Sequence, residues 1–395
     1  MKTNILIEAE TKLVTALMVY QQFVDFEKIG EISVRFRLTK NIRADDLKWA
    51  DIFLSVRSQN LLSTYYANIC EKYGIIHCVL LDDNLFIQIR KDRYMKSRQK
   101  ELRKILNKTD CLFVCNELLG KKITKECKVQ RVVKTDTTVL PAEIKKRKKP
   151  DELTYKIVYY SNDGSNDYFS QVILPALSSI KLDSKVEVHC IGMKQIEYDV
   201  DNCIIKYIPH LSFLEFRKYL SSQGFSAGLA PLPQCDGFSE YKYINKYIEF
   251  SIAGIPGIYS DTHPYKGTIH HQQNGILTGN STSEWSKAIA SLVKDRELQE
   301  RIVSTSQSEL YNYYSSRGNW NRICSQFPEI CKYKSPYIEK LNISKWVVFQ
   351  YWIFWIMEKF NSVHRNFRAL GIMGLYERIK EYFLLSKQVP IQEGK

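Results

Sequence analysis

The stretch of sequence that decides the fold is residues 225–261, FSAGLAPLPQCDGFSEYKYINKYIEFSIAGIPGIYSD. A short apolar segment, a glycine-bearing loop, a helical segment, a Gly-x-Pro turn and a second apolar segment follow one another in it. This order predicts a right-handed crossover between two parallel strands. Pro231 and Pro233 end the first strand, because proline cannot continue a hydrogen-bonded ladder. The chain therefore leaves the sheet at its carboxyl edge, where open α/β sheets bind their ligands.

The helix of this stretch carries a cation and a carboxylate, Lys246 and Glu249, three residues apart and so on one face. A lysine ammonium donates to phosphate oxygens, and a carboxylate accepts hydrogen bonds from the two hydroxyls of a ribose. Together they suit a nucleoside diphosphate. We also predict that Gly237, Phe238 and Asn245, in the preceding loop and the first helical turn, bind this ligand. The alternative is an ordinary ion pair between Lys246 and Glu249 on a solvated helix face.

The same stretch resembles the nucleotide-binding segment of the glycosyl transferases group 1, which are retaining, family 4-like enzymes of the two-Rossmann-domain (GT-B) type. The matching residues lie in the helix, the Ala-x-Gly-x-Pro turn and the strand after it: Lys246, Glu249, Ala253, Gly254, Pro256, Ser260 and Asp261. Many members carry another glutamate eight residues before the helical one, where this sequence has Tyr241, so no role is transferred to Glu240. The resemblance implies an α/β fold of two Rossmann-like domains that face each other across a cleft.

Length and composition agree with such an architecture. The 395 residues suffice for roughly two domains of about 150 to 200 residues and an appendage. A hydrophobic content of 44% with 25% charged residues is typical of a globular protein. We expect an acceptor domain over residues 1–140, a basic linker over 141–153, a nucleotide-sugar domain over 154–330 and a helical tail over 331–395. Around residues 320–327 we expect a helix that crosses back to the first domain.

In the first domain, the continuous apolar run Ile75–Leu81 predicts a strand buried on both faces of a parallel sheet. Asp82 and Asp83 follow it directly. Carboxylates at the carboxyl end of such a strand can accept a proton or a hydrogen bond from a sugar hydroxyl, so we predict that both are catalytic. The resemblance places the acceptor beside this loop. The alternative is that both residues cap a helix expected to begin near residue 87.

In the second domain, Tyr155–Ser161 is the first predicted strand, and a polar loop that contains Gly164 follows it before a helix. A loop that leads into a helix N-terminus offers backbone N–H groups to a phosphate. The resemblance places the β-phosphate and the donor sugar at this loop. We therefore predict that Ser161, Asn162, Gly164 and Ser165 bind the nucleotide-sugar. The alternative is a plain turn capped by Ser165.

The net charge of +14 comes from basic residues in three places, residues 90–108, residues 145–149 and the tail after residue 332. The sequence has no RNP-type, zinc-finger or helix-turn-helix signature, so we expect no nucleic-acid partner. An anionic membrane surface suits such separate basic patches better. Ten cysteines without a Cys-x-x-Cys pair, and no secretory signal, favour a cytoplasmic protein, peripheral at the inner face of the cell membrane.

The tail contains an aromatic segment over residues 346–357, WVVFQYWIFWIM. It is too short to span a bilayer, which needs about 20 residues. Tryptophan and tyrosine with flanking lysine and arginine are typical of an anchor that lies in the headgroup plane. The alternative is a helical appendage that packs its aromatic face on the domains or on a second subunit.

Taken together with the resemblance, these features imply a hexosyltransferase-type enzyme of cell-surface polysaccharide biosynthesis. It would transfer a sugar, with retention of configuration, from a nucleoside diphosphate sugar to a saccharide or lipid-linked saccharide acceptor. We expect no cofactor and no metal, because His270 and His271 are adjacent and no carboxylate or cysteine completes a ligand set. Two alternatives remain: a nucleotide-sugar epimerase on the same fold, and a non-catalytic scaffold tethered to a membrane.

Overall fold

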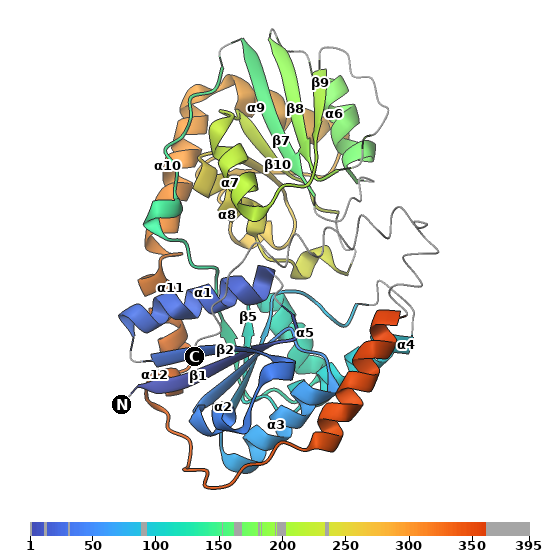
Figure 1. Ribbon diagram of the computed structural model, residues 1–395. Helices are drawn as coiled ribbons and strands as arrows, with labels where there is room; N and C mark the ends of the chain where they lie inside the picture. The colour runs from blue at the N-terminus through green and yellow to red at the C-terminus, as the bar shows by residue number, and fades with distance from the viewer. Residues whose placement is uncertain are drawn as a thin grey trace. The chain divides into compact units, whose positions relative to one another are not determined.

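The structure is a computed structural model. It describes residues 2–11, 14–30, 32–87, 93–151, 153–161, 168–180, 182, 184–193, 195, 203–233 and 237–360. The chain forms two compact units. Residues 1–137 and the chain from residue 316 onward make up the first unit, and residues 138–315 make up the second. Each unit contains one six-stranded parallel sheet flanked by helices (Figure 1). The predicted α/β fold with two Rossmann-like domains is thus confirmed.

The sheet of the first unit has the strand order β2-β1-β3-β4-β5-β6. Its strands are β1 (Thr3–Ala9), β2 (Ile32–Leu38), β3 (Ile52–Val56), β4 (Ile76–Leu81), β5 (Cys111–Val114) and β6 (Val132–Lys134). The helices before β6 are α1 (Val14–Ile29), α2 (Ala44–Trp49), α3 (Leu61–Tyr73), α4 (Arg93–Leu106) and α5 (Glu117–Glu126). Helix α3 ends at Gly74, whose φ of 70° is the left-handed conformation of a C-cap glycine.

Alternate residues of β1 enter two different cores, because successive side chains of a strand point to opposite faces of the sheet. Ile5 and Ile7 pack with α1. Leu6 packs on the other face with α2 and α3. Strand β4 is buried from His77 to Leu81, as expected of a strand covered on both faces.

The sheet of the second unit has the order β12-β11-β10-β7-β8-β9. Its strands are β7 (Thr154–Tyr160), β8 (Lys185–Ile191), β9 (Cys203–Ile208), β10 (Ala227–Ala230), β11 (Gly257–Ser260) and β12 (Ile276–Thr278). Its helices are α6 (Leu174–Ser178), which continues a π-helical turn, α7 (Phe213–Ser222), α8 (Asn245–Ala253), α9 (Thr282–Lys294) and α10 (Arg296–Asn312). Ile157 packs with α6 and α9, and Val158 packs on the other face with α7, α8 and α10.

The predicted crossover unit is present as β10, α8 and β11. Gly228 of β10 pairs in parallel register with Gly257 of β11. Gly254 ends α8 in the left-handed conformation with φ of 70°. Gly228 is needed for close packing, since a Cβ there would lie 2.7 Å from ring atoms of Phe250. The glycines of this stretch therefore set both the end of the helix and its approach to the sheet.

Helix α11 (Ser316–Gln326) returns to the first unit, as expected of the segment around residues 320–327. The Trp320 ring packs at a tilt against Phe26 of α1, with ring centres 5.1 Å apart. Trp320 and Ile323 are buried in the core that also holds Ile5 and Ile7 of β1. Helix α12 (Glu329–Lys332) follows, with Ile330 buried in the same core.

The described part of the tail ends in a helix over residues 345–360, which runs beside α3 and α4 (Figure 1). Tyr351 is buried against α3, and Ile338 and Leu341 of the preceding segment are buried in the same core. We call residues 345–360 the tail helix. Within the described residues, no helix is long and apolar enough to cross a membrane.

Candidate nucleotide and acceptor sites

Lys246 lies where the sequence predicts, at the carboxyl edge of the second sheet. Its Nζ is 4.4 Å from the centre of the Tyr159 ring and 5.1 Å from that of Tyr160, the last two residues of β7. Both rings present an electron-rich face to the ammonium, which favours the charge at this place. The result is a half-buried positive charge at the carboxyl end of β7.

Glu249 is 8% exposed and is held by an arginine of the preceding helix. Arg217 of α7 donates from Nε to Oε2 and from Nη2 to Oε1, both over 2.8 Å. Its remaining Nη1 pairs with Glu143. Glu249 therefore pairs with Arg217 rather than with Lys246, and the alternative of an intrahelical Lys246–Glu249 ion pair is wrong.

Arg217 remains a cation in this environment. Burial by itself lowers the pKa of Arg217, but the hydrogen bonds and charges of Glu249 and Glu143 outweigh it, and the pKa is raised. A planar guanidinium that grips both oxygens of a carboxylate fixes the carboxylate plane as well as its position. Each Glu249 oxygen keeps a second lone pair for another donor.

Four of the other predicted nucleotide-sugar residues are described: Ser161, Gly237, Phe238 and Asn245. The backbone N–H of Ser161 donates to Ile191 of the neighbouring strand over 3.2 Å. Gly237 is exposed with φ of 71°, and Phe238 lies under Lys242, whose Nζ is 4.8 Å from the ring centre. Asn245 is the exposed first residue of α8. The remaining three predicted residues, Asn162, Gly164 and Ser165, lie outside the described residues.

The arginine that organises this site is not predicted from the sequence. Arg217 is 32 residues before Glu249, and nothing in its helix except a Ser-x-x-Glu capping box, Ser212 with Glu215, distinguishes it from a surface segment. The signal that could have prompted a search for a cationic partner is a carboxylate within the largely apolar helical segment of residues 245–253. The tyrosines under Lys246 are visible in the sequence as the end of a predicted strand.

Asp82 and Asp83 lie at the carboxyl edge of the first sheet, and one arginine holds both. Arg57 follows β3 and has φ of 54°, in the left-handed region of backbone conformation. Its Nε is 3.0 Å from Asp82 Oδ1 and its Nη2 is 3.2 Å from Asp83 Oδ2. Thr15 donates its hydroxyl to Asp82 Oδ2 over 3.1 Å. The two side chains are 23% and 29% exposed, so both stay within reach of a ligand.

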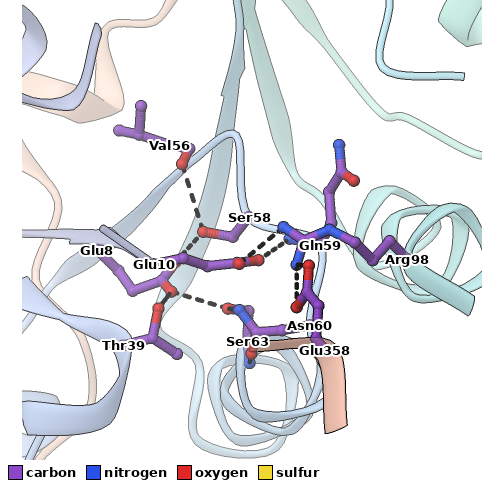
Figure 2. Close-up of polar contacts among 10 residues, drawn as sticks. All are labelled: Glu8, Glu10, Thr39, Val56, Ser58, Gln59, Asn60, Ser63, Arg98 and Glu358. Atoms are coloured by element: carbon purple, nitrogen blue, oxygen red, sulfur yellow. Dashed lines mark hydrogen bonds and ion pairs between the residues drawn. The ribbon is translucent and has the colours of Figure 1, made fainter. Parts of the chain in front are cut away.

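A second group of acids lies at the same edge, at the end of β1 (Figure 2). Glu8 is completely buried and accepts hydrogen bonds from the hydroxyls of Ser58 (2.6 Å), Ser63 (2.8 Å) and Thr39. Burial raises the pKa of Glu8, and the three hydroxyls offset part of that rise. These contacts tie the ends of β1, β2 and β3 together. The group is absent from the sequence-based prediction, because its members come from three separate segments.

Glu10 extends this group to α4 and the tail helix (Figure 2). It accepts from the backbone N–H of Gln59 over 2.8 Å and from Nη2 of Arg98 over 2.7 Å. The Nη1 of Arg98 is 3.2 Å from Glu358 of the tail helix. Arg98 thus joins the β1 loop to the tail. In the described part of the chain, no group of three or more histidine, cysteine or acidic side chains is arranged to hold a metal ion.

Comparison with known proteins identifies the fold. No protein-family model matches the sequence, and no curated protein matches it either. Among solved structures, Anabaena Alr3699/HepE in complex with UDP and glucose aligns with a TM-score of 0.57 and 10% identity over 83% of this chain and 100% of its own. Sucrose-phosphate synthase from Thermosynechococcus elongatus aligns with a TM-score of 0.57 and 10% identity, over 83% of this chain and 98% of its own.

The lipopolysaccharide outer core galactosyltransferase WaaB, in its apo form, aligns with a TM-score of 0.51 and 14% identity, over 82% of this chain and 100% of its own. At this level of identity the likeness establishes the fold alone. The chain has the GT-B fold, with two Rossmann-like domains and a helical C-terminal segment.

Proposed function

We propose that this protein is a glycosyltransferase that moves a sugar from a nucleoside diphosphate sugar to a saccharide acceptor. The observation that carries the proposal is the placement of Lys246 at the carboxyl end of β7, beside the rigid Glu249–Arg217 pair. This is the edge at which α/β sheets bind their ligands. The similar structure of HepE was obtained with UDP and glucose bound, which supports a nucleotide-sugar donor for this fold.

In the donor site, Lys246 contacts the diphosphate and stabilises the negative charge that develops on it as the sugar leaves. Glu249 accepts hydrogen bonds from the ribose hydroxyls with the lone pairs that Arg217 does not use. The loop from Ser161 to Ser165 and the residues Gly237, Phe238 and Asn245 complete the contacts to the nucleotide-sugar. The acceptor oxygen replaces the diphosphate on the same face of the sugar, so configuration at the anomeric carbon is retained.

In the acceptor site, Asp82 and Asp83 receive hydrogen bonds from the sugar hydroxyls of the acceptor, and one of them accepts the hydroxyl proton during transfer. Arg57 holds both carboxylates in place. We propose a hexose as the transferred sugar and a lipid-linked saccharide as the acceptor. The reaction then belongs to cell-surface polysaccharide biosynthesis and takes place at the inner face of the cell membrane, without a cofactor or a metal ion.

The experiment that tests the donor site is a calorimetric titration of the full chain with UDP. We expect Lys246→Ala to weaken binding by about tenfold, equivalent to about 1.4 kcal/mol. Lys218→Ala is the matched control, because Lys218 is an exposed lysine of α7 in the same unit. Equal affinities of the two variants would contradict the proposed role of Lys246.

Incubation with a nucleoside diphosphate sugar separates the remaining possibilities. A transferase needs an acceptor and yields a product whose anomeric configuration, read by NMR, matches that of the donor. An epimerase alters the sugar without any acceptor. A scaffold leaves the nucleotide-sugar unchanged in every mixture, and that result would overturn the proposal.

A further inference from the structure

The tail helix has two apolar faces, one packed against α3 and the other exposed. Its inward face packs on the first unit through Val347, Val348, Tyr351, Trp352 and Trp355. The outward face is unusually apolar for an exposed surface, with exposed fractions of 63% for Trp346, 53% for Phe349, 44% for Ile353, 45% for Ile356, 53% for Met357 and 73% for Phe360.

The outward residues form a continuous stripe. At 100° per residue, the six positions fall within an arc of about 100°, opposite to the inward set. Scattered single hydrophobic residues are normal on a protein surface, whereas an uninterrupted stripe of large ones marks an interaction site. The stripe contains a tryptophan and two phenylalanines, which favour the boundary between headgroups and acyl chains.

The charges around the stripe are positive. Lys345 and Lys359 are exposed at the two ends of the tail helix, and Lys96 and Lys100 are exposed on the adjacent helix α4. Within the described residues, Lys96, Lys100 and Lys345 have no acidic partner closer than 4.0 Å, the limit for an ion pair. The acid of the tail helix, Glu358, is turned inward to Arg98. The tail helix and α4 therefore expose large apolar side chains together with Lys96, Lys100 and Lys345, which have no acidic partner among the described residues.

We propose that the outward face of the tail helix, together with the exposed lysines of α4, docks the protein onto an anionic lipid bilayer. The apolar stripe enters the headgroup layer, and the lysines contact lipid phosphates. A second copy of the chain fits this face less well, because a symmetric contact would gather the lysines of both copies at one interface. The inference deepens the proposed function by naming the membrane surface, but it rests on residues of the first unit alone.

The test is co-sedimentation of the full chain with vesicles, without donor or acceptor. We expect binding to phosphatidylcholine vesicles that contain phosphatidylglycerol, and binding weaker by about tenfold or more to phosphatidylcholine alone. The double variant Trp346→Ser/Phe349→Ser should lose about tenfold or more in partition. The matched control is Leu214→Ser, since Leu214 is 78% exposed on α7 of the second unit and should have no effect.

A second variant tests the charges. Lys96→Ser/Lys100→Ser should reduce partition to anionic vesicles several-fold and leave the weak binding to neutral vesicles unchanged. Equal partition of the wild type and the Trp346→Ser/Phe349→Ser variant would overturn the inference. So would a wild-type dimer that this variant converts to a monomer in light scattering without any change in vesicle binding. Because UDP binding is measured separately, failure of vesicle binding and failure of the sugar-transfer proposal are distinguishable.

Discussion

Arg217 gives Glu249 its fixed orientation, and the two acids that share this arginine offer a way to separate catalysis from folding. Glu249 takes the bidentate side of the guanidinium and Glu143 takes the remaining nitrogen. Only Glu249 belongs to the helix that carries Lys246. A substitution at either acid leaves Arg217 with one carboxylate partner, so neither strands the buried cation.

We therefore expect Glu249→Ala and Glu143→Ala to differ in activity. Loss of hydrogen bonds from the ribose to a charged group should lower kcat/KM of Glu249→Ala by a factor on the order of 100, since such bonds contribute about 1.5 to 3 kcal/mol each. Glu143→Ala should keep its kcat/KM within a few-fold. Steady-state kinetics on both variants measure the difference. If both lose activity alike, Glu249 acts only through the packing of Arg217.

Glu8 predicts a pH dependence of stability. Burial raises the pKa of Glu8 above its ordinary value of 4.5, and the charge of Glu10 adds to that rise. A carboxyl whose pKa is raised in the folded state stabilises the fold while protonated, and this contribution is lost as the pH rises above about 4.5. Glu8→Gln is uncharged at every pH. In urea unfolding between pH 4.5 and 8, stability of the wild type relative to Glu8→Gln should fall with rising pH, and a constant difference would contradict the assignment.

For single residues, the sequence predicts the place in the fold better than it predicts the hydrogen-bond and ion-pair partners. Lys246 is predicted correctly at the sheet edge, because prolines and glycines determine where β10 ends and α8 begins. Arg57 and Arg217 are not predicted, although each organises acids that are. Their partners lie 26 and 32 residues away on other elements. Local spacing carries no information on such contacts.

At the scale of elements, the contact between β10 and α8 depends on a missing side chain. A Cβ at Gly228 would lie 2.7 to 2.8 Å from three ring atoms of Phe250. Gly228→Ala should therefore lower the free energy of unfolding by about 1 to 3 kcal/mol through overpacking. Phe250→Leu in the same chain should recover part of that loss, which a double-mutant cycle detects. Gly267→Ala is the control, since no heavy atom lies within 4 Å of its Cβ position; equal losses in the two alanine variants would refute the clash.

Arg98 links α4 to the tail helix, and Arg103 of the same helix serves as the comparison for its substitution. The Arg98 side chain is 19% exposed and pairs with Glu10 and Glu358. Arg98→Met should reduce stability by about 2 to 3 kcal/mol, because it leaves two half-buried carboxylates without their cation. Arg103 is 48% exposed and pairs with Glu126. Arg103→Met should therefore reduce stability by less than about 1 kcal/mol.

Hydrogen exchange locates the effect of the Arg98 substitution. The amides of residues 345–360 should exchange faster in Arg98→Met than in Arg103→Met, because the tail helix loses a polar contact to the first unit while its apolar contacts remain. Unchanged exchange in the tail helix would show that its aromatic packing alone fixes it.

For the whole molecule, the sequence predicts the fold because the same local sequence pattern recurs along the chain. Apolar runs that end in polar loops, such as Ile75–Leu81, predict parallel strands, and the crossover at residues 225–261 predicts their connection. The tail is different. Its segment over residues 346–357 is apolar almost all round, so periodicity alone does not separate a packed face from an exposed one, and the structure has both.

Because the chain is divided into two units, we expect UDP binding and vesicle binding to be independent of each other. Lys246 belongs to the unit of residues 138–315, and the tail helix belongs to the other unit. If each unit binds its own partner, Lys246→Ala should weaken UDP binding about tenfold with vesicle binding unchanged, since sites without shared contacts behave additively. Trp346→Ser/Phe349→Ser should weaken vesicle binding and leave UDP binding unchanged.

Transfer to an acceptor embedded in a vesicle needs both functions, because docking raises the effective concentration of enzyme at the acceptor. Both variants should therefore lose activity on an embedded acceptor. On a soluble acceptor saccharide, the membrane contributes nothing, and only Lys246→Ala should be impaired. An equal loss of Trp346→Ser/Phe349→Ser on both acceptors would mean that the tail helix supports the fold or the acceptor site directly, rather than bringing the enzyme to its substrate.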